Sequence, residues 1–235
     1  MLYQRCSLSP EVQLGIWQLS ETLDDFRSLL PAAMVDEAER RFRAPHRQLE
    51  WLAARALLFQ LLGREAEIAY LPSGKPYLRE CPSLPQQSPS LQSQVSSLQN
   101  EDSSLQSQVS SLHISISHTR GYVAVILGPF TVGVDIEQYG PRVHKVAHKF
   151  MRPDEPVTVY EGDDTWCLLL HWSAKETLFK CIDSEDVDFR DHLRLFPFTI
   201  AKSGCFQARE YRTPQKRRFD IHYLLHPEFV LTYIY

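Results

Sequence analysis

The amino-acid sequence predicts an α+β fold built from two similar halves, each combining helices with strands. Two long apolar stretches with helical spacing, at residues 47–62 and 164–181, indicate one buried helix in each half. Short apolar runs bounded by glycine and proline indicate the strands that accompany these helices.

The composition is that of a soluble globular protein. The chain has 235 residues, 43% of them hydrophobic and 23% charged, which is enough for one large or two small domains. A net charge of −4 argues against nucleic acid as the main partner. Basic residues nevertheless cluster, which suits a small phosphorylated ligand or an acidic protein, although a solvated surface is the simpler interpretation of any single cluster. The clusters are Arg40, Arg41, Arg43 and Arg47, then residues 145–152, then 216–218.

Cysteine usage and the lack of targeting signals predict a reduced, cytoplasmic protein without a membrane span. The five cysteines are odd in number and lack metal-site spacing. No signal peptide and no apolar run long enough to cross a membrane are evident. Zinc is not expected, because the histidine pairs have neither a cysteine pair nor an HExxH pattern nearby.

The first half reads as strands around the first long helix. We expect a strand at residues 14–19, a helical stretch over 24–41, and a helix over 47–62 that ends at Gly63. A strand at 68–71 and a turn at 73–76 follow, and Tyr77 begins another strand.

Residues 82–112 form a separate segment rich in serine, glutamine and leucine. A nine-residue sequence occurs twice, at 90–98 and 104–112, and leucines recur every seven residues from Leu84 to Leu112. This spacing is compatible with a small coiled-coil oligomerisation helix. We favour a duplicated segment inserted in a loop, because serine is a poor helix former and charged flanking residues are few.

The second half continues with three strands and two helices. We expect strands at 113–118, 122–127 and 132–137, helices at 143–151 and 164–181, and short strands in the last third. The expected domains are an N-terminal lobe (1–81), the insertion (82–112) and a C-terminal lobe (113–235), whose first strands could complete the N-terminal lobe.

Acidic residues on a predicted strand and a predicted helix suggest a metal site. Asp135 and Glu137 are two residues apart on a strand and share a face, whereas Glu176 and Lys180 share a helix face with Trp172. If the two faces meet, three carboxylates and an ammonium converge, which suits Mg²⁺ held partly by a substrate phosphate. For the Glu176 and Lys180 pair alone, a surface ion pair is the favoured explanation.

Four further residues offer groups for a phosphorylated ligand. Arg55 lies within an apolar helix and needs an anionic partner, either an internal carboxylate or a ligand phosphate. Lys75 lies on a tight turn, and Ser117 and His118 end a strand. For His118, a structural role is the default interpretation.

Taken in order, these segments resemble the 4′-phosphopantetheinyl transferases, in particular their larger, monomeric, two-lobed class. The motifs are Ser73-Gly74-Lys75-Pro76, Ile116-Ser117-His118-Thr119, Gly133-Val134-Asp135-Ile136-Glu137, and Trp172-Ser173-Ala174-Lys175-Glu176 with Lys180. The segment 149–155 also resembles the family's sequence between the last two motifs. The insertion and Cys181-Ile182-Asp183 depart from the family pattern.

The resemblance implies a pseudo-dimer of two α/β lobes with the active site between them. It implies a holo-[acyl-carrier-protein] synthase that moves the 4′-phosphopantetheine of coenzyme A to a serine of an apo acyl or peptidyl carrier protein, releasing adenosine 3′,5′-bisphosphate. Asp135, Glu137 and Glu176 would hold Mg²⁺, and Glu176 would also be the general base. Lys180 and His118 would bind the diphosphate. The nucleotide and its 3′-phosphate would be bound by Arg47, Arg55, Lys75, Pro76 and Ser117.

The carrier is expected to be acidic, by the same resemblance. The segment 144–152 offers cations beside an apolar pair, Phe150 and Met151, that reads as exposed, although a solvated basic helix face explains it nearly as well. Two rival functions remain open: another Mg²⁺-dependent phosphohydrolase, and a non-catalytic coenzyme A-binding or adaptor protein.

Overall fold

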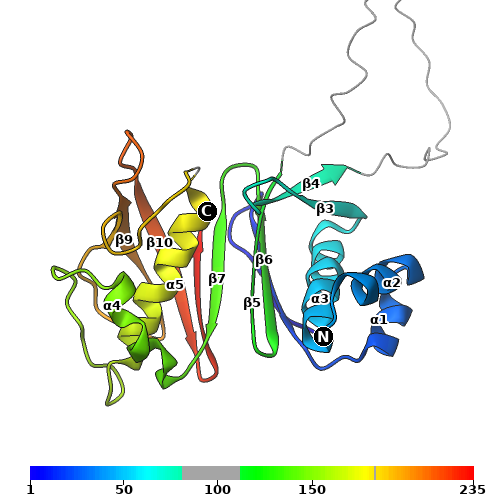
Figure 1. The fold of residues 1–235 in the computed structure, drawn as a ribbon, viewed down its shortest axis with the longest axis horizontal. Helices are drawn as coiled ribbons and strands as arrows, with labels where there is room; N and C mark the ends of the chain where they lie inside the picture. The colour runs from blue at the N-terminus through cyan, green and yellow to red at the C-terminus, as the bar shows by residue number, and fades with distance from the viewer. Residues whose placement is uncertain (81–111, 183) are drawn as a thin grey trace, which may run out of the picture.

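The computed structural model describes residues 1–80, 112–182 and 184–235, and in this part of the chain helices combine with antiparallel sheets (Figure 1). The prediction of a fold that mixes helices with strands is confirmed. The predicted insertion lies almost entirely outside the described residues, so both interpretations of its repeat stay predictions. No helix among the described residues is both long enough and apolar enough to cross a bilayer.

The first sheet carries its helices on one face. Its antiparallel strands lie in the order β1-β2-β6-β5. The strands are β1 (Leu2–Ser7), β2 (Gln13–Gln18), β5 (His113–Thr119) and β6 (Tyr122–Gly128). The helices are α1 (Leu23–Leu29), α2 (Ala32–Arg41) and α3 (Pro45–Leu62). A separate hairpin, β3 (Ala66–Tyr70) with β4 (Pro76–Glu80), follows α3.

The second sheet begins with the strand that carries the predicted acids. Its antiparallel strands lie in the order β7-β11-β10-β9-β8. They are β7 (Gly133–Gln138), β8 (Leu193–Leu195), β9 (Ser203–Glu210), β10 (Arg218–His226) and β11 (Phe229–Ile234). The helices are α4 (Ala147–Phe150) and α5 (Thr165–Cys181), preceded by the 3₁₀-helix η1 (Pro141–Lys145).

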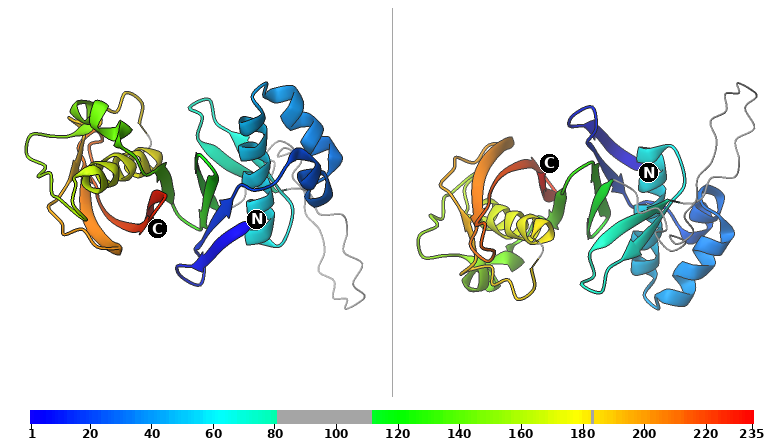
Figure 2. Two further views of the ribbon diagram at one scale, coloured as in Figure 1. Left: turned by 90° about the horizontal axis from the view of Figure 1, so that it is seen from below. Right: turned by 90° about the horizontal axis from the view of Figure 1, so that it is seen from above.

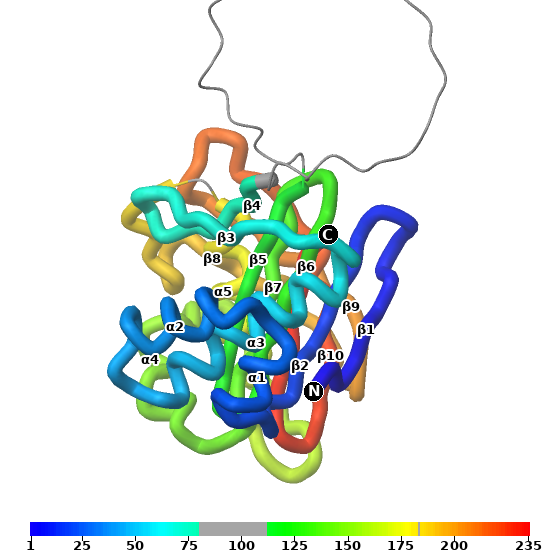
Figure 3. Tube along the Cα trace, turned by 90° about the vertical axis from the view of Figure 1, so that its right-hand side faces the viewer, coloured from blue at the N-terminus to red at the C-terminus, as the bar shows by residue number. Residues whose placement is uncertain are grey.

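The two sheets pack face to face, with the helices outside them (Figures 1 and 2). Apolar side chains of β2 and β6 meet those of β7 and β11 in one buried cluster. Strand β6 is buried along its whole length, because one face contacts α3 and the other faces the second sheet. Figure 3 shows β5, β6 and β7 at the centre of the molecule. The central strands are therefore placed by packing on both sides.

The long helices agree with prediction, whereas two shorter helical stretches are divided. Helix α3 ends at Gly63, whose φ of 67° suits glycine. The stretch 24–41 breaks because Pro31 holds Leu30 in extended backbone. The stretch 143–151 breaks at Val146, which separates η1 from α4. Strand β1 was not predicted, because none of its residues is fully buried and Gln4 interrupts the apolar residues on its half-buried face.

Candidate functional site

Close packing of β7 on α5 brings the predicted acids to the helix. A Cβ atom at Gly133 would lie 2.5 Å from the Cys181 sulfur and 2.8 Å from the Thr177 carbonyl oxygen. Glycine is therefore required here for close approach and not for an unusual backbone angle. The hydroxyls of Ser173 and Thr177 contact that of Thr232 on β11, at 2.9 and 2.6 Å, and tie the helix to the sheet.

Asp135 is held by groups from both halves of the molecule. Its Oδ1 accepts hydrogen bonds from the Ser117 hydroxyl at 2.8 Å and from the Lys180 ammonium at 2.9 Å. Lys180 also donates to the Val134 carbonyl at 2.8 Å. The other oxygen, Oδ2, is buried and finds no hydrogen-bond partner among the described residues. A buried carboxylate oxygen without a partner is costly, so this atom requires an explanation.

Burial and nearby negative charge raise the pKa of both Glu137 and Glu176. Burial raises the pKa of Glu137 to about 7, and the neighbouring charges of Asp135 and Glu176 add to the rise. The Trp172 indole opposes it by donating to Glu137 at 2.7 Å. Burial, followed by the charge of Asp135, raises the pKa of Glu176 to about 7, and Lys180 opposes this rise. Three carboxylates and one ammonium thus share one partly buried region.

These residues fit a hard divalent cation, although they do not yet form a closed cage. Among the described residues, no group of three or more His, Cys, Asp or Glu side chains is already gathered as a metal site. A bound Mg²⁺ would give the Asp135 Oδ2 a partner and would offset the burial and the neighbouring negative charge that raise the pKa of Glu137 and Glu176. The donor set is all oxygen, which favours Mg²⁺ over zinc.

A cavity of about 590 Å³ opens beside these acids, between the two halves. Glu176 and Lys180 line it from α5, and His118 lines it from β5. The turn before β4 contributes Lys75 and Pro76 to the same cavity. Burial lowers the pKa of His118, and the nearby cations Arg47 and Lys180 lower it further. The cavity therefore brings several of the predicted ligand-binding residues together.

A second cavity, of about 640 Å³, lies on the other side of the acids. Glu137 and Trp172 line it, together with Tyr139 and Arg142 from the segment after β7. Since Glu176 lines the first cavity and Glu137 the second, the carboxylates stand between two spaces that could each take a substrate.

The second half of the chain matches a known protein family. Residues 131–234 match the family model described as the 4′-phosphopantetheinyl transferase superfamily. Residues 131–234 therefore form a phosphopantetheinyl transferase domain. The matched segment contains Asp135, Glu137, Glu176 and Lys180. A search of curated proteins found no match to the chain.

The motif lysine of the transferase domain, Lys175, points away from these acids. Its ammonium is fully buried and donates to Glu155 at 2.7 Å and to the Phe150 carbonyl at 2.6 Å. Burial lowers the pKa of Lys175, and Glu155 opposes the change. Glu155 also accepts from the backbone of Leu195 at 2.7 Å. This lysine therefore anchors α5 to the loop after α4 and to β8.

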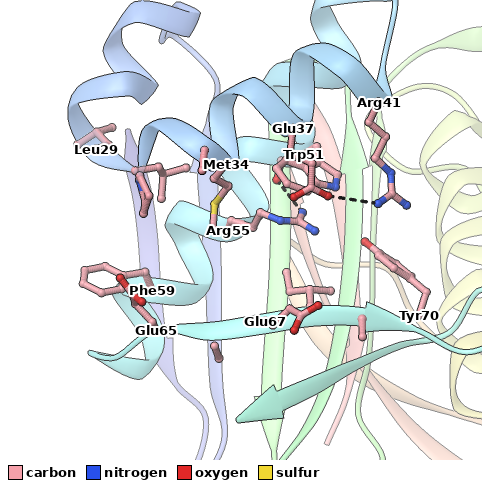
Figure 4. A pocket seen from close by; sticks show the side chains of 16 residues that line it. Leu29, Met34, Glu37, Arg41, Trp51, Arg55, Phe59, Glu65, Glu67 and Tyr70 are labelled. Atoms are coloured by element: carbon pink, nitrogen blue, oxygen red, sulfur yellow. Dashed lines mark hydrogen bonds and ion pairs between the residues drawn. The ribbon is translucent and has the colours of Figure 1, made fainter. Parts of the chain in front are cut away.

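Arg55 lies in a different cavity from Lys75, about 600 Å³ in volume, between α2, α3 and β3 (Figure 4). Its guanidinium stacks 3.2 Å from the centre of the Trp51 ring and donates to the Trp51 carbonyl at 3.1 Å. Burial lowers the pKa of Arg55 to about 10. The charge of Glu37 acts to raise the pKa of Arg55, but the Glu37 carboxylate forms its ion pair with Arg41, at 3.9 Å. Tyr70 lines both cavities and is the link between Arg55 and Lys75.

Two other predicted ligand-binding residues have protein partners. Arg47 contacts His118 at 3.0 Å and Glu50 at 3.1 Å. Ser117 is buried and is bonded to Asp135, as described above.

The expectation of an exposed apolar pair at Phe150 and Met151 is wrong, because Met151 is half-buried against the core and Phe150 is buried. Phe150 is fully buried and packs against Trp172, because the short helix α4 turns it inward. Lys145 and Lys149 are exposed.

Sequence reasoning missed the groups that hold the acids in place. The Trp172 bond to Glu137 could not be inferred from helical spacing alone, because it depends on how close β7 lies to α5. The alternation of hydroxyl residues at Ser115, Ser117 and Thr119 was a signal that went unused.

Removing the charge of Glu176 should stabilise the metal-free protein in a pH-dependent manner. The pKa of Glu176 is raised from 4.5 to about 7, so the folded protein binds more protons than the unfolded chain between these values. Stability due to this group therefore falls as pH rises through that range. In EDTA, Glu176→Gln should be more stable than wild type at pH 8 by roughly 1–2 kcal/mol, and no more stable at pH 4.5. Urea unfolding measures the difference.

The matched control is Glu185→Gln, which changes an exposed carboxylate of the same cavity and should alter stability at neither pH. An equal effect of Glu176→Gln at both pH values would contradict the raised pKa.

Proposed function

We propose that this protein transfers the 4′-phosphopantetheine group of coenzyme A to a serine of an apo acyl or peptidyl carrier protein. The observation that carries the proposal is the convergence of Asp135, Glu137, Glu176 and Lys180 within the family-matched segment. One of the carboxylate oxygens, Asp135 Oδ2, has no hydrogen-bond partner in the part of the chain that the structure describes. A diphosphate bound to Mg²⁺ supplies the charges that such a set lacks.

Asp135, Glu137 and Glu176 are the residues that would hold Mg²⁺. When bound, the metal would neutralise charge on the diphosphate. Asp135 would use its free Oδ2, since Oδ1 is already bonded to Ser117 and Lys180. Phosphoryl-type transfer depends chiefly on positioning and charge neutralisation, which this arrangement can supply.

Side chains of this protein remove the proton of the attacking serine and bind the diphosphate. The carrier's serine oxygen attacks the phosphorus that bears the pantetheine, and the bond from that phosphorus to the bridging oxygen breaks. Adenosine 3′,5′-bisphosphate then leaves. Glu176 takes the serine proton, directly or through water, and a pKa near 7 suits a general base at neutral pH. Lys180 and His118 contact the diphosphate from the walls of the first cavity.

The two cavities suit two substrates that meet at the acids. We assign coenzyme A to the cavity with Lys75 and Pro76, and the carrier to the one with Glu137 and Trp172. A nucleotide that crosses Tyr70 would also reach Arg55, whose buried cation forms no ion pair with a described carboxylate. We retain Arg55 and Lys75 as the 3′-phosphate site on this basis.

The fold supports a pseudo-dimer that functions as a monomer. Helix α3 packs on β2 and β6 much as α5 packs on β7 and β11, and the first cavity lies between the two halves. Because one chain supplies both walls of that cavity, a second chain is not needed to complete the site. The halves divide between β6 and β7, since β5 and β6 pair into the first sheet.

The direct test is transfer to apo-carrier proteins in the presence of coenzyme A and Mg²⁺. Wild type should add the mass of one phosphopantetheine group to a carrier, and Asp135→Asn should transfer at least about a hundredfold more slowly, because a charge that stabilises the transition state is lost. Asp220→Asn, the same change at an exposed site on β10, is the matched control and should be fully active. Intact-protein mass spectrometry gives the readout.

Near-normal transfer by Asp135→Asn would exclude the metal assignment. Cleavage of coenzyme A without any modified carrier would instead indicate a phosphohydrolase.

The 3′-phosphate assignment is tested by comparing coenzyme A with 3′-dephospho-coenzyme A. Lys75→Ala and Arg55→Ala should each weaken coenzyme A binding about tenfold, as expected for the loss of a charge-assisted contact, and weaken the dephospho compound much less. Arg79→Ala removes an exposed arginine from β4 of the same hairpin and should affect neither ligand. Calorimetric titration measures the constants. Equal losses for both ligands in Arg55→Ala would make Arg55 a structural residue.

The exposed cations after β7 suit an acidic carrier surface. Lys145 and Lys149 are exposed close to Arg142, which lines the second cavity. Charge reversal at both lysines should raise the KM for the carrier several-fold, more at low salt, and leave coenzyme A affinity unchanged. The exposed Lys216 provides the matched control for a reversed surface charge. If the KM for the carrier changes neither with the charge reversal nor with the salt concentration, the carrier binds to another surface.

A further inference from the structure

Three hydroxyls of β5 form a regular set of bonds to β7. The Ser115 hydroxyl accepts from the backbone N–H of Val134 at 3.1 Å, and the Ser117 hydroxyl accepts from that of Ile136 at 3.3 Å. The Thr119 hydroxyl accepts from the N–H of Gln138 at 3.0 Å. We call these three contacts the hydroxyl ladder.

The ladder joins the edges of two different sheets. Strand β5 is the last strand of the first sheet, and β7 is the first strand of the second, paired with β11 on its other side. Residues two apart on a strand share a face, so alternate hydroxyls on β5 meet alternate N–H groups on β7. Side-chain oxygens thus take the place of the backbone carbonyls that another strand would supply, and they satisfy an otherwise open edge.

Ser117 differs from the other two members because it also contacts a carboxylate. Its hydroxyl has one proton, which it donates to Asp135 Oδ1 at 2.8 Å, while it accepts from Ile136. Lys180 donates to the same oxygen. With both donors on Oδ1, the carboxylate is oriented so that Oδ2 stays buried and unbonded within the described residues.

We propose that Ser117 is a positioning residue for Asp135, because its hydroxyl alone links the hydroxyl ladder to the Asp135 carboxylate. This inference rests on the proposed function, because it assigns Oδ2 to the metal. It differs from the expectation that Ser117 contacts the nucleotide. Ser117 is 8% exposed, and its single proton is already given to Asp135, so it has none to donate to a phosphate.

The test uses Mn²⁺ as the probe, with binding followed by electron paramagnetic resonance in the presence of coenzyme A. Ser117→Ala should weaken Mn²⁺ binding about tenfold, the usual effect of removing a group that orients a metal ligand. Coenzyme A affinity without metal should stay within about twofold of wild type. Thr119→Val is the matched control, since valine is similar in size to threonine and the lost ladder hydroxyl is bonded to the Gln138 backbone and not to Asp135. The Mn²⁺ affinity of this variant should stay close to wild type.

Each outcome has a distinct meaning. Unchanged Mn²⁺ affinity in Ser117→Ala, or an equal loss in Thr119→Val, would overturn the positioning role. A loss of coenzyme A affinity without metal would favour the nucleotide-contact role. If wild type itself binds no Mn²⁺ at the site, the proposed function fails together with this inference.

If Ser117→Ala does not fold, Ser117→Cys replaces it, since a thiol fills the space but is a weak hydrogen-bond partner. At least a threefold loss of Mn²⁺ affinity is then expected, and no loss would overturn the proposal.

Discussion

The packing of one sheet against the other determines where every candidate group lies. Buried apolar residues of β2, β6, β7 and β11 hold the sheets face to face, and the hydroxyl ladder fixes β5 against β7 along their edges. Apolar contact is strong but not directional, whereas each ladder bond requires one register. Asp135 on β7 pairs with Lys180, which lines the first cavity together with His118 of β5. This junction therefore positions groups from both halves around that cavity.

The acids are tolerated in this junction because their neighbours partly compensate them. Lys180 pairs with Asp135, and Trp172 donates to Glu137, yet the pKa of both Glu137 and Glu176 remains about 7. A protein selected only for stability would replace one of these carboxylates, since like charges in a buried region repel. The unfavourable arrangement is understandable if a cation and a phosphorylated substrate complete it, and it connects the fold to the proposed transfer reaction.

Local patterns predicted much of this structure, and contacts distant in sequence account for the rest. The helices α3 and α5 and the strand β7 were predictable, because long apolar periodicity and alternation are local signals. The convergence of Glu176 and Lys180 on Asp135 followed from helical spacing once the helix was placed on the strand. The separation of Arg55 from Lys75 did not follow, because it depends on how the hairpin after α3 folds back. Likewise, Ser117 reads as a ligand contact in its motif, and only the position of β7 shows that its partner is Asp135.

The central claim is that Asp135, Glu137 and Glu176 bind one divalent cation at the junction of the two halves. Anomalous diffraction from crystals of the protein grown with coenzyme A and Mn²⁺ tests this most directly. The account predicts a single strong manganese peak next to the Asp135 Oδ2 atom, with both glutamate carboxylates turned toward it. A peak elsewhere, or none while coenzyme A occupies the first cavity, would contradict it.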